Sequence, residues 1–160
     1  MDIIEVRNKQ GVPDVFGQDA KKSIKEMGIS GIEEVLASEI YGFEGSAGDD
    51  ELRSVAENIL VDSVIQEYSL NGEKQSAGES RFVADVFYKK GVTDPVADTV
   101  KTAVKDAGIK TDMSVFTGKR YYLRGSLTEE DVKAVCMKLL VNPLIQSYSI
   151  RYEEGKKSNA

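Results

Sequence analysis

Residues 139–150 read LLVNPLIQSYSI, and residues 59–70 read ILVDSVIQEYSL. When the chain is compared with itself at an offset of 80 positions, without a gap, 20 of the 65 positions from 6 to 70 are identical. Common residues at ordinary frequencies would give about 4 identities. A period of this length indicates two tandem copies of a small domain rather than the short unit of a solenoid.

The repeat divides the chain into four predicted segments. Copy 1 covers residues 1–70 and copy 2 covers residues 82–152. Residues 71–81 lie between them, and because this stretch is polar and contains Gly, Ser and Glu, we expect a flexible linker. Residues 153–160 are expected to form a polar tail.

Each copy has the same predicted order of elements, β-α-β-(β)-α-β. The opening strands are expected at 3–9 and 82–89, where apolar and polar residues partly alternate. The middle segments, 33–45 and 113–125, are enriched in β-branched and aromatic residues, which indicates strand. Gly118-Lys119 fits either a hairpin turn or a kink in one long strand, and the sequence leaves both open.

Aspartates are predicted to start the first helix of each copy. Asp94 stands directly before a proline, an arrangement typical of a helix N-cap followed by the first helical residue, and Asp14 holds the equivalent position. We therefore interpret both carboxylates as caps rather than catalytic groups. Gly28 and Gly108 are expected to end these helices, because glycine tolerates the left-handed conformation that follows a helix.

The second helix of each copy is predicted from an apolar stripe at i, i+3, i+4, i+7 and i+8. The stripe consists of Leu52, Val55, Ala56, Ile59 and Leu60 in copy 1, and of Val132, Val135, Cys136, Leu139 and Leu140 in copy 2. Ser46 before Asp49, and Ser126 before Glu129, are expected to start these helices as capping boxes.

Strands combined with two helices per copy predict an α+β fold with a mostly antiparallel sheet. A single copy of about 70 residues is close to the lower limit for an independent core. We therefore expect the two copies to form a pseudo-two-fold pair.

Composition excludes several classes of function. The chain is 41% hydrophobic and 30% charged, which is typical of a folded domain, and no apolar run approaches the roughly 18 residues that cross a membrane. We expect no secretory signal in the opening residues. A net charge of −6 disfavours nucleic-acid binding. The single cysteine, Cys136, allows no internal disulfide and favours a reducing cytoplasm.

The chain contains no histidine, which excludes Ser-His-Asp and Cys-His catalysis and histidine-ligated zinc. Cys136 lies on the predicted apolar helix face, so we interpret it as a small buried hydrophobe rather than a nucleophile. We assign no catalytic residue, no cofactor-binding residue and no metal ligand. Lys119, Arg120 and Arg124 form a basic cluster that could contact an acidic partner or a phosphate, or could simply be a solvated strand face. Tyr148 is a further candidate for a partner contact.

Three stretches of copy 2 resemble a known family. VTDP (92–95), TGKRYYL (117–123) and CMKLLVNPLIQSY (136–148) are similar to the signature of PurS, the small subunit of formylglycinamide ribonucleotide amidotransferase, also called phosphoribosylformylglycinamidine synthase. The resemblance covers essentially all of residues 82–152. Copy 1 departs from it, with Ser38-Glu39 in place of the glycine–lysine pair and Asp62-Ser63 in place of the asparagine–proline pair.

The resemblance implies a non-catalytic assembly role in purine biosynthesis. A PurS dimer is expected to join a PurL-type, ATP-dependent synthetase subunit to a PurQ-type glutaminase subunit and to support ammonia transfer between them. The chain itself is expected to bind no cofactor, since ATP, magnesium and glutamine are used by the partner subunits. Nucleic acid and membranes are not expected partners.

In a tandem chain the two halves of that dimer are linked covalently, at an effective concentration on the order of millimolar. Further self-association is left open. Two alternatives remain at this level: a PurS-like N-terminal module of a larger single-chain synthetase, or a tandem regulatory domain that senses a small metabolite.

Overall fold

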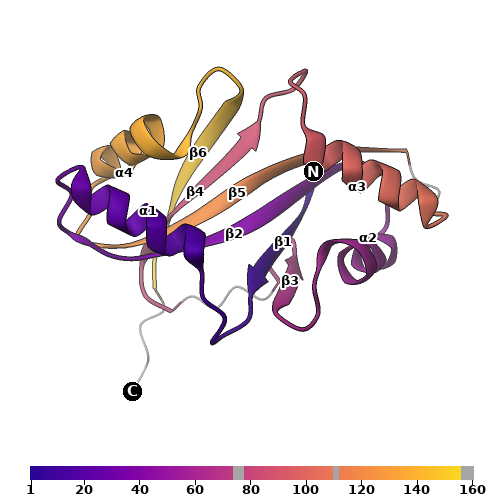
Figure 1. The fold of residues 1–160 in the computed structure, drawn as a ribbon, viewed down its shortest axis with the longest axis horizontal. Helices are drawn as coiled ribbons and strands as arrows, with labels where there is room; N and C mark the ends of the chain where they lie inside the picture. The colour runs from indigo at the N-terminus through magenta and orange to yellow at the C-terminus, as the bar shows by residue number, and fades with distance from the viewer. Residues whose placement is uncertain (74–77, 110–111, 156–160) are drawn as a thin grey trace. The chain divides into compact units, whose positions relative to one another are not determined.

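The computed structural model describes residues 1–73, 78–109 and 112–155. Parts of the predicted linker and tail therefore lie outside the described residues. Copy 1 contains β1 (Asp2–Asn8), α1 (Val15–Glu26), β2 (Ile32–Gly45), α2 (Asp49–Val55), the π-helix η1 (Ala56–Leu60) and β3 (Gln66–Leu70). Copy 2 contains β4 (Arg81–Tyr88), α3 (Pro95–Asp106), β5 (Met113–Gly125), α4 (Glu129–Val135), the π-helix η2 (Cys136–Leu140) and β6 (Gln146–Glu153) (Figure 1).

Neighbouring strands are hydrogen-bonded in the order β3-β1-β2-β5-β4-β6. Strand β1 pairs antiparallel with β2 and β3, and β4 pairs antiparallel with β6. The order reads the same from either edge when each strand is replaced by its counterpart in the other copy. This confirms the predicted α+β fold of two equivalent copies with an antiparallel sheet.

The long middle strands decide the alternative that the sequence left open. Strand β5 continues through Gly118 and Lys119 without a turn, so this stretch is one long strand rather than a hairpin. Its counterpart β2 is also continuous. Their length allows each of them to contribute to two separate packing units.

The chain forms two compact units that do not coincide with the two copies. Unit 1 consists of Met1–Val12, Ser38–Gln75 and Lys90–Gly118, and unit 2 consists of Pro13–Ala37, Ser76–Lys89 and Lys119–Ala160. Helix α1 of copy 1 therefore lies in unit 2, and helix α3 of copy 2 lies in unit 1. The copies exchange their first helices.

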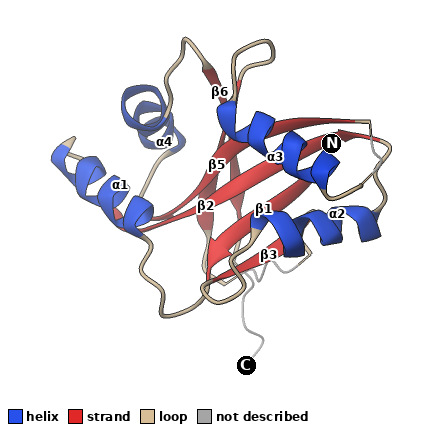
Figure 2. Cartoon of the chain, turned by 45° about the vertical axis from the view of Figure 1, so that its right-hand side comes forward, coloured by secondary structure: helices blue, strands red, loops and turns tan. Residues whose placement is uncertain are grey.

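Each unit has its own hydrophobic core on the helix side of its strands. In unit 1 the buried side chains come from β1, β2, β3, α2, η1, α3 and β5: Ile4, Val6, Tyr41, Phe43, Leu52, Val55, Ala56, Leu70, Ala97, Val100, Val104 and Val115. In unit 2 they come from α1, β2, β4, β5, α4 and η2: Ala20, Ile24, Ile32, Val35, Ala84, Val86, Tyr121, Leu123, Val132, Val135 and Cys136. Figure 2 shows α2 and α3 over the strands of unit 1.

The exchanged helices are essential parts of these cores. Val100 and Val104 of α3 are 5% exposed, and Ile24 of α1 is 0% exposed. Burial of one such side chain contributes about 1.5–3 kcal/mol. Neither copy can therefore complete a core from its own residues.

The predicted caps of the first helices are confirmed. The Oδ1 atom of Asp14 accepts a hydrogen bond from the Gly17 N–H at 2.9 Å, and that of Asp94 accepts one from the Ala97 N–H at 3.0 Å. The other carboxylate oxygen of Asp14 accepts a hydrogen bond from the Ala37 N–H at 2.7 Å, so one side chain ties the helix start to the strand.

Gly28 and Gly108 follow these helices directly, as predicted. Their φ angles are +92° and +77°, in the region that favours glycine. The preceding residues, Met27 and Ala107, are the C-caps.

The predicted starts of the second helices are wrong. The capping box of α4 is formed by Thr128 and Asp131 rather than by Ser126 and Glu129. Ser126 cannot form the reciprocal bond of a capping box because its N–H donates to the Gly31 carbonyl, at 3.0 Å. In copy 1 the N-cap of α2 is Gly48, which has no side chain to accept a hydrogen bond, so Ser46 and Asp49 form no capping box.

The second helices are not regular to their ends. Each closes in a π-helical segment in which the Val61 N–H bonds the Ala56 carbonyl at 3.1 Å, and the Val141 N–H bonds the Cys136 carbonyl at 3.0 Å. This five-residue spacing widens the last turn. The first members of each apolar stripe are buried, whereas Leu139 is 37% exposed.

Candidate partner-binding surfaces

The four residues predicted as partner contacts all belong to unit 2, but they have different environments. Lys119, Arg120 and Arg124 lie on β5, and Tyr148 lies on β6. The accessibility of each decides its role, because only an accessible side chain can contact a partner without rearrangement.

Arg120 is part of the interior. Its Nε donates to Asp85 Oδ1 at 2.6 Å and its Nη2 donates to Asp85 Oδ2 at 2.9 Å, and only 6% of its side chain is exposed. Arg151 adds a contact from β6, with Nη1 3.1 Å from Asp85 Oδ2. This bidentate pair fixes a buried charge and leaves Arg120 little access to an outside partner. The sequence contained a signal for the burial of Arg120, because copy 1 has an isoleucine, Ile40, at the equivalent position. Ile40 is itself buried.

Lys119 contacts an exposed aromatic ring that is absent from the residues predicted as partner contacts. Its ammonium lies 3.0 Å from the ring centroid of Phe16, in the first turn of α1. Phe16 is 60% exposed. An apolar side chain on the solvent side of a helix start is the signal that could have identified it. The two residues form a cation–π pair at the surface of unit 2.

Arg124 is held by carboxylates at the surface. Its Nη1 lies 2.8 Å from Glu33 and 2.6 Å from Glu79, and its Nε lies 3.8 Å from Glu34. Exposed ion pairs contribute at most about 1 kcal/mol each. Arg124 also lines a cavity of about 360 Å³ in unit 2, together with the carboxylates of Glu34 and Glu79 and the guanidinium group of Arg81.

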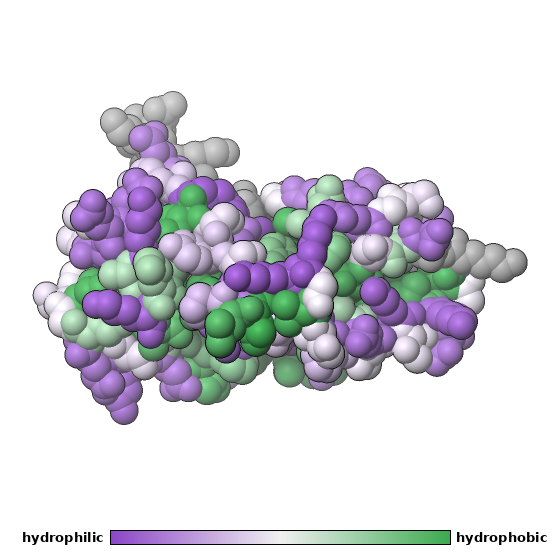
Figure 3. All heavy atoms as spheres, turned by 90° about the horizontal axis from the view of Figure 1, so that it is seen from above, coloured by the Kyte–Doolittle hydropathy of each residue, from purple (hydrophilic) through white to green (hydrophobic). Residues whose placement is uncertain are grey.

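Tyr148 belongs to an exposed apolar patch that we call the α4–β6 patch, formed by Met137, Leu139, Leu144 and Tyr148. Met137 is 66% exposed and Leu144 is 83% exposed. In Figure 1 the loop that carries Leu144 connects α4 to β6. Figure 3, a view of one face only, shows apolar side chains in green reaching the surface between hydrophilic ones in purple.

The equivalent surface of copy 1 is a polar network. The Tyr68 hydroxyl donates to Glu57 Oε1 at 2.8 Å, and burial together with this carboxylate raises the pKa of Tyr68. Arg53 donates to both oxygens of Glu73, at 2.9 and 2.6 Å. Because Glu57 and Tyr68 are equivalent to Met137 and Tyr148, their contact also indicates that Met137 and Tyr148 are neighbours.

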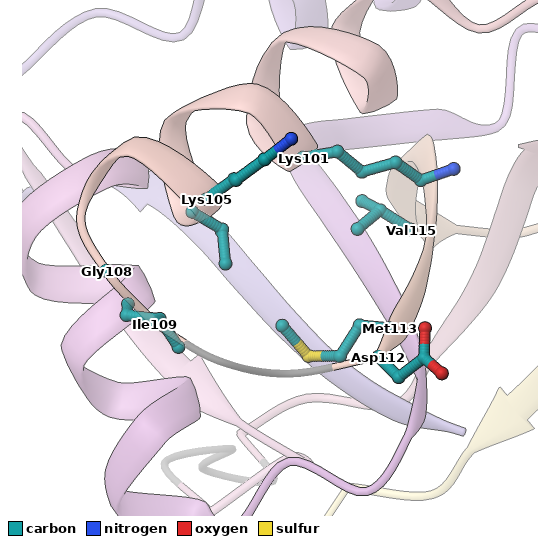
Figure 4. A pocket seen from close by; sticks show the side chains of 8 residues that line it. Lys101, Lys105, Gly108, Ile109, Asp112, Met113 and Val115 are labelled. Atoms are coloured by element: carbon teal, nitrogen blue, oxygen red, sulfur yellow. The ribbon is translucent and has the colours of Figure 1, made fainter.

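Unit 1 contains a cavity of about 440 Å³ between α3 and β5 (Figure 4). Its wall is mainly apolar, and the side chains of Lys101 and Lys105 extend along its rim rather than into it. Small-molecule sites usually combine an apolar wall with a few convergent polar groups. Asp112, which lines this cavity, is equivalent in the repeat to Ile32 of unit 2. Ile32 is 3% exposed and packs in the core of its unit.

Cys136 is buried, as predicted. The thiol is 0% exposed, and burial raises its pKa to about 11. Across residues 1–73, 78–109 and 112–155, no three His, Cys, Asp or Glu side chains are grouped so that they could hold a metal ion. No helix within the same ranges has the length and apolar character needed to cross a membrane.

Comparison with known proteins identifies the family. The sequence model of PurS, described as phosphoribosylformylglycinamidine (FGAM) synthase, matches the chain twice, at residues 3–74 and 81–154. The phosphoribosylformylglycinamidine synthase subunit PurS of Archaeoglobus fulgidus is 34% identical over 79 residues, which are 45% of this chain and 99% of the relative. The subunit of the same name from Thermotoga maritima is 28% identical over 76 residues, which are 44% of this chain and 93% of the relative.

Each of these relatives therefore has about the length of one copy, and the family model finds both copies. Copy 2, which has the specific motifs, and copy 1, which departs from them, are two versions of one domain. The chain belongs to the PurS family and carries two PurS repeats in tandem.

Proposed function

We propose that this chain is a non-catalytic assembly subunit of phosphoribosylformylglycinamidine synthase. In this role it joins an ATP-dependent synthetase of the PurL type to a glutaminase of the PurQ type in the cytoplasm and supports ammonia transfer between them. The observation that carries the proposal is the double family match, since both named relatives are subunits of that synthase. ATP, magnesium and glutamine are used by the partners, and this chain binds none of them.

The exchange of first helices supports the role of a permanent pair. Unit 1 needs α3 of copy 2, and unit 2 needs α1 of copy 1. Covalent linkage makes this association independent of protein concentration, since one copy meets the other at an effective concentration on the order of millimolar. A joining subunit built in this way cannot lose one of its halves by dilution.

The divergence of the two units supports a role with two different partners. Unit 1 contains 15 acidic and 8 basic residues, a formal charge of −7, whereas unit 2 contains 12 acidic and 13 basic residues, a formal charge of +1. Electrostatic complementarity selects partners and controls the rate of association. Two units of unequal charge therefore offer surfaces suited to unlike proteins.

Reconstitution tests the proposal. The synthetase and glutaminase subunits from the same organism are assayed for conversion of formylglycinamide ribonucleotide to its amidine, with glutamine or with ammonia as the nitrogen source. We expect omission of this chain to abolish most of the glutamine-dependent turnover and to leave the ammonia-dependent turnover in place. Unchanged glutamine-dependent turnover would refute the proposed role.

A further inference from the structure

The α4–β6 patch differs from its copy 1 equivalent in a consistent direction. Two exposed carboxylates of the copy 1 surface are replaced by uncharged residues in copy 2. The pairs are Glu57 and Met137, and Asp62 and Asn142. At a third exposed position, Asn58 is replaced by Lys138. Copy 2 has therefore lost two negative charges and gained a positive one on a surface with the same backbone.

Three apolar side chains of the patch are exposed. Leu144 is 83% exposed, Met137 is 66% exposed and Tyr148 is 37% exposed. Methionine and tyrosine are enriched in the centres of protein interfaces, where charged residues are depleted. In copy 1 the charged Glu57 occupies the position of Met137 and engages the tyrosine instead.

The loop that presents Leu144 is held by specific hydrogen bonds. Lys89 Nζ donates to the Pro143 carbonyl at 2.7 Å, and the Asn142 N–H donates to Gln146 Oε1 at 2.9 Å. Asn142 Oδ1 in turn accepts from the Leu144 N–H at 3.2 Å. A loop fixed before binding loses less conformational entropy when a partner arrives.

Positive charge borders the patch. Lys138 lies in η2, and Lys133, five residues earlier in α4, makes an exposed contact to Glu129 at 3.6 Å. A complementary surface would place carboxylates around an apolar centre. The equivalent acidic surface of copy 1 would repel such a partner.

We propose that the α4–β6 patch docks a partner protein subunit whose contact area has an apolar centre bordered by carboxylates, and that the equivalent copy 1 surface does not bind that partner. The inference rests on the proposed function and deepens it. It assigns one partner contact to one of the two diverged copies.

Matched substitutions in the full-length chain test this assignment. Leu144→Glu introduces a charge into the patch, and Val64→Glu introduces the same charge at the equivalent position, which is 80% exposed. Binding of each variant to the purified synthetase subunit and to the purified glutaminase subunit is measured by titration calorimetry. We expect Leu144→Glu to weaken binding to one subunit at least tenfold and Val64→Glu to change it less than twofold. Thermal unfolding of both variants checks that each is folded.

A second pair of variants tests the charge on the border. We expect Lys138→Glu to weaken the same binding several-fold at low salt, and we expect this effect to shrink in 0.5 M salt because ions screen exposed charges. Asn58→Glu, at the equivalent copy 1 position, is expected to have no such salt-dependent effect.

The outcomes separate this inference from the proposed function. Equal losses for Leu144→Glu and Val64→Glu, or binding unchanged by both, overturn the assignment while the joining role stands. A wild-type chain that binds neither subunit overturns both. Sedimentation of the chain alone shows whether a second copy is the occupant: if Leu144→Glu dissociates a homo-oligomer, the patch is a self-contact and the docking proposal is wrong.

Discussion

Asp94 and Thr117 fasten the start of helix α3 to strand β5. The Thr117 N–H donates to Asp94 Oδ2 at 2.9 Å, and the Thr117 hydroxyl lies 2.8 and 2.9 Å from the two carboxylate oxygens. Because Asp94 also caps the helix through the Ala97 N–H, one side chain fixes both the beginning of α3 and its position against unit 1.

We predict that Asp94→Ala lowers the free energy of unfolding by about 2 kcal/mol, through loss of the cap and of the half-buried hydrogen bonds to Thr117. Urea unfolding followed by circular dichroism measures the change. Asp98→Ala, an exposed carboxylate one turn later, is the control and should cost less than about 0.5 kcal/mol. Equal effects of the two variants would contradict the anchoring role of Asp94.

The exchange of first helices predicts which strands lose stability when a core substitution creates a cavity. Ile24 and Leu52 both belong to copy 1 and are both 0% exposed, but Ile24 packs in unit 2 and Leu52 packs in unit 1. Alanine at either position should cost about 2–5 kcal/mol. Hydrogen exchange should show Ile24→Ala loosening β4 and β6, and Leu52→Ala loosening β1 and β3. If Ile24→Ala loosened β1 and β3 instead, the exchange would be disproved.

Arg120 supplies a prediction about buried charge. Arg120→Met removes the bidentate partner of Asp85 and leaves that carboxylate, 9% exposed, with Arg151. Breaking such a pair typically costs about 3–5 kcal/mol, and we expect a loss near the lower limit because Arg151 remains. Arg124→Met, in an exposed network, should cost less than about 1 kcal/mol. Chemical denaturation of the two variants compares them, and a larger loss for Arg124→Met is the opposite of what we expect.

Burial of Cys136 predicts both reactivity and pH dependence. Because burial raises the pKa of the thiol from 9.0 to about 11, the native thiol stays protonated at pH 8 and should react with Ellman's reagent only when the chain unfolds. In the unfolded chain the thiol ionises near pH 9, so stability should fall as the pH rises from 9 towards 11. Cys136→Ala, which copies Ala56 of copy 1, should remove this component of the pH dependence. Rapid labelling of the native protein by Ellman's reagent would contradict the predicted protection of the Cys136 thiol.

Local features of the fold could be predicted from the sequence because they depend on near neighbours in the chain. The caps at Asp14 and Asp94 and the glycines after each first helix follow from short-range chemistry. The π-helical turns could not be predicted in this way, since the apolar stripe fits a regular helix equally well. The capping error at Ser126 has a long-range cause, a hydrogen bond to Gly31.

The exchange of helices could not be predicted from the sequence because the two copies carry the same pattern. The stripe that includes Ala20 and Ile24 would fit the core of either copy. Among the partner candidates, Arg120 was assigned from its charge, whereas its burial follows from the direction in which its side chain leaves the strand. Met137 lies outside the apolar stripe of its helix, so its apolar character and its exposure were both visible in the sequence, although we did not assign it to a partner contact.

The exchanged helices also set an order of events during synthesis. The last segment of unit 1, Lys90–Gly118, belongs to copy 2, so the core of unit 1 cannot close while only copy 1 has left the ribosome. At about 5–20 residues per second, the first strands wait for several seconds with their apolar face uncovered. We therefore expect the nascent chain to bind chaperones, and we expect a polypeptide truncated after the first copy to be degraded.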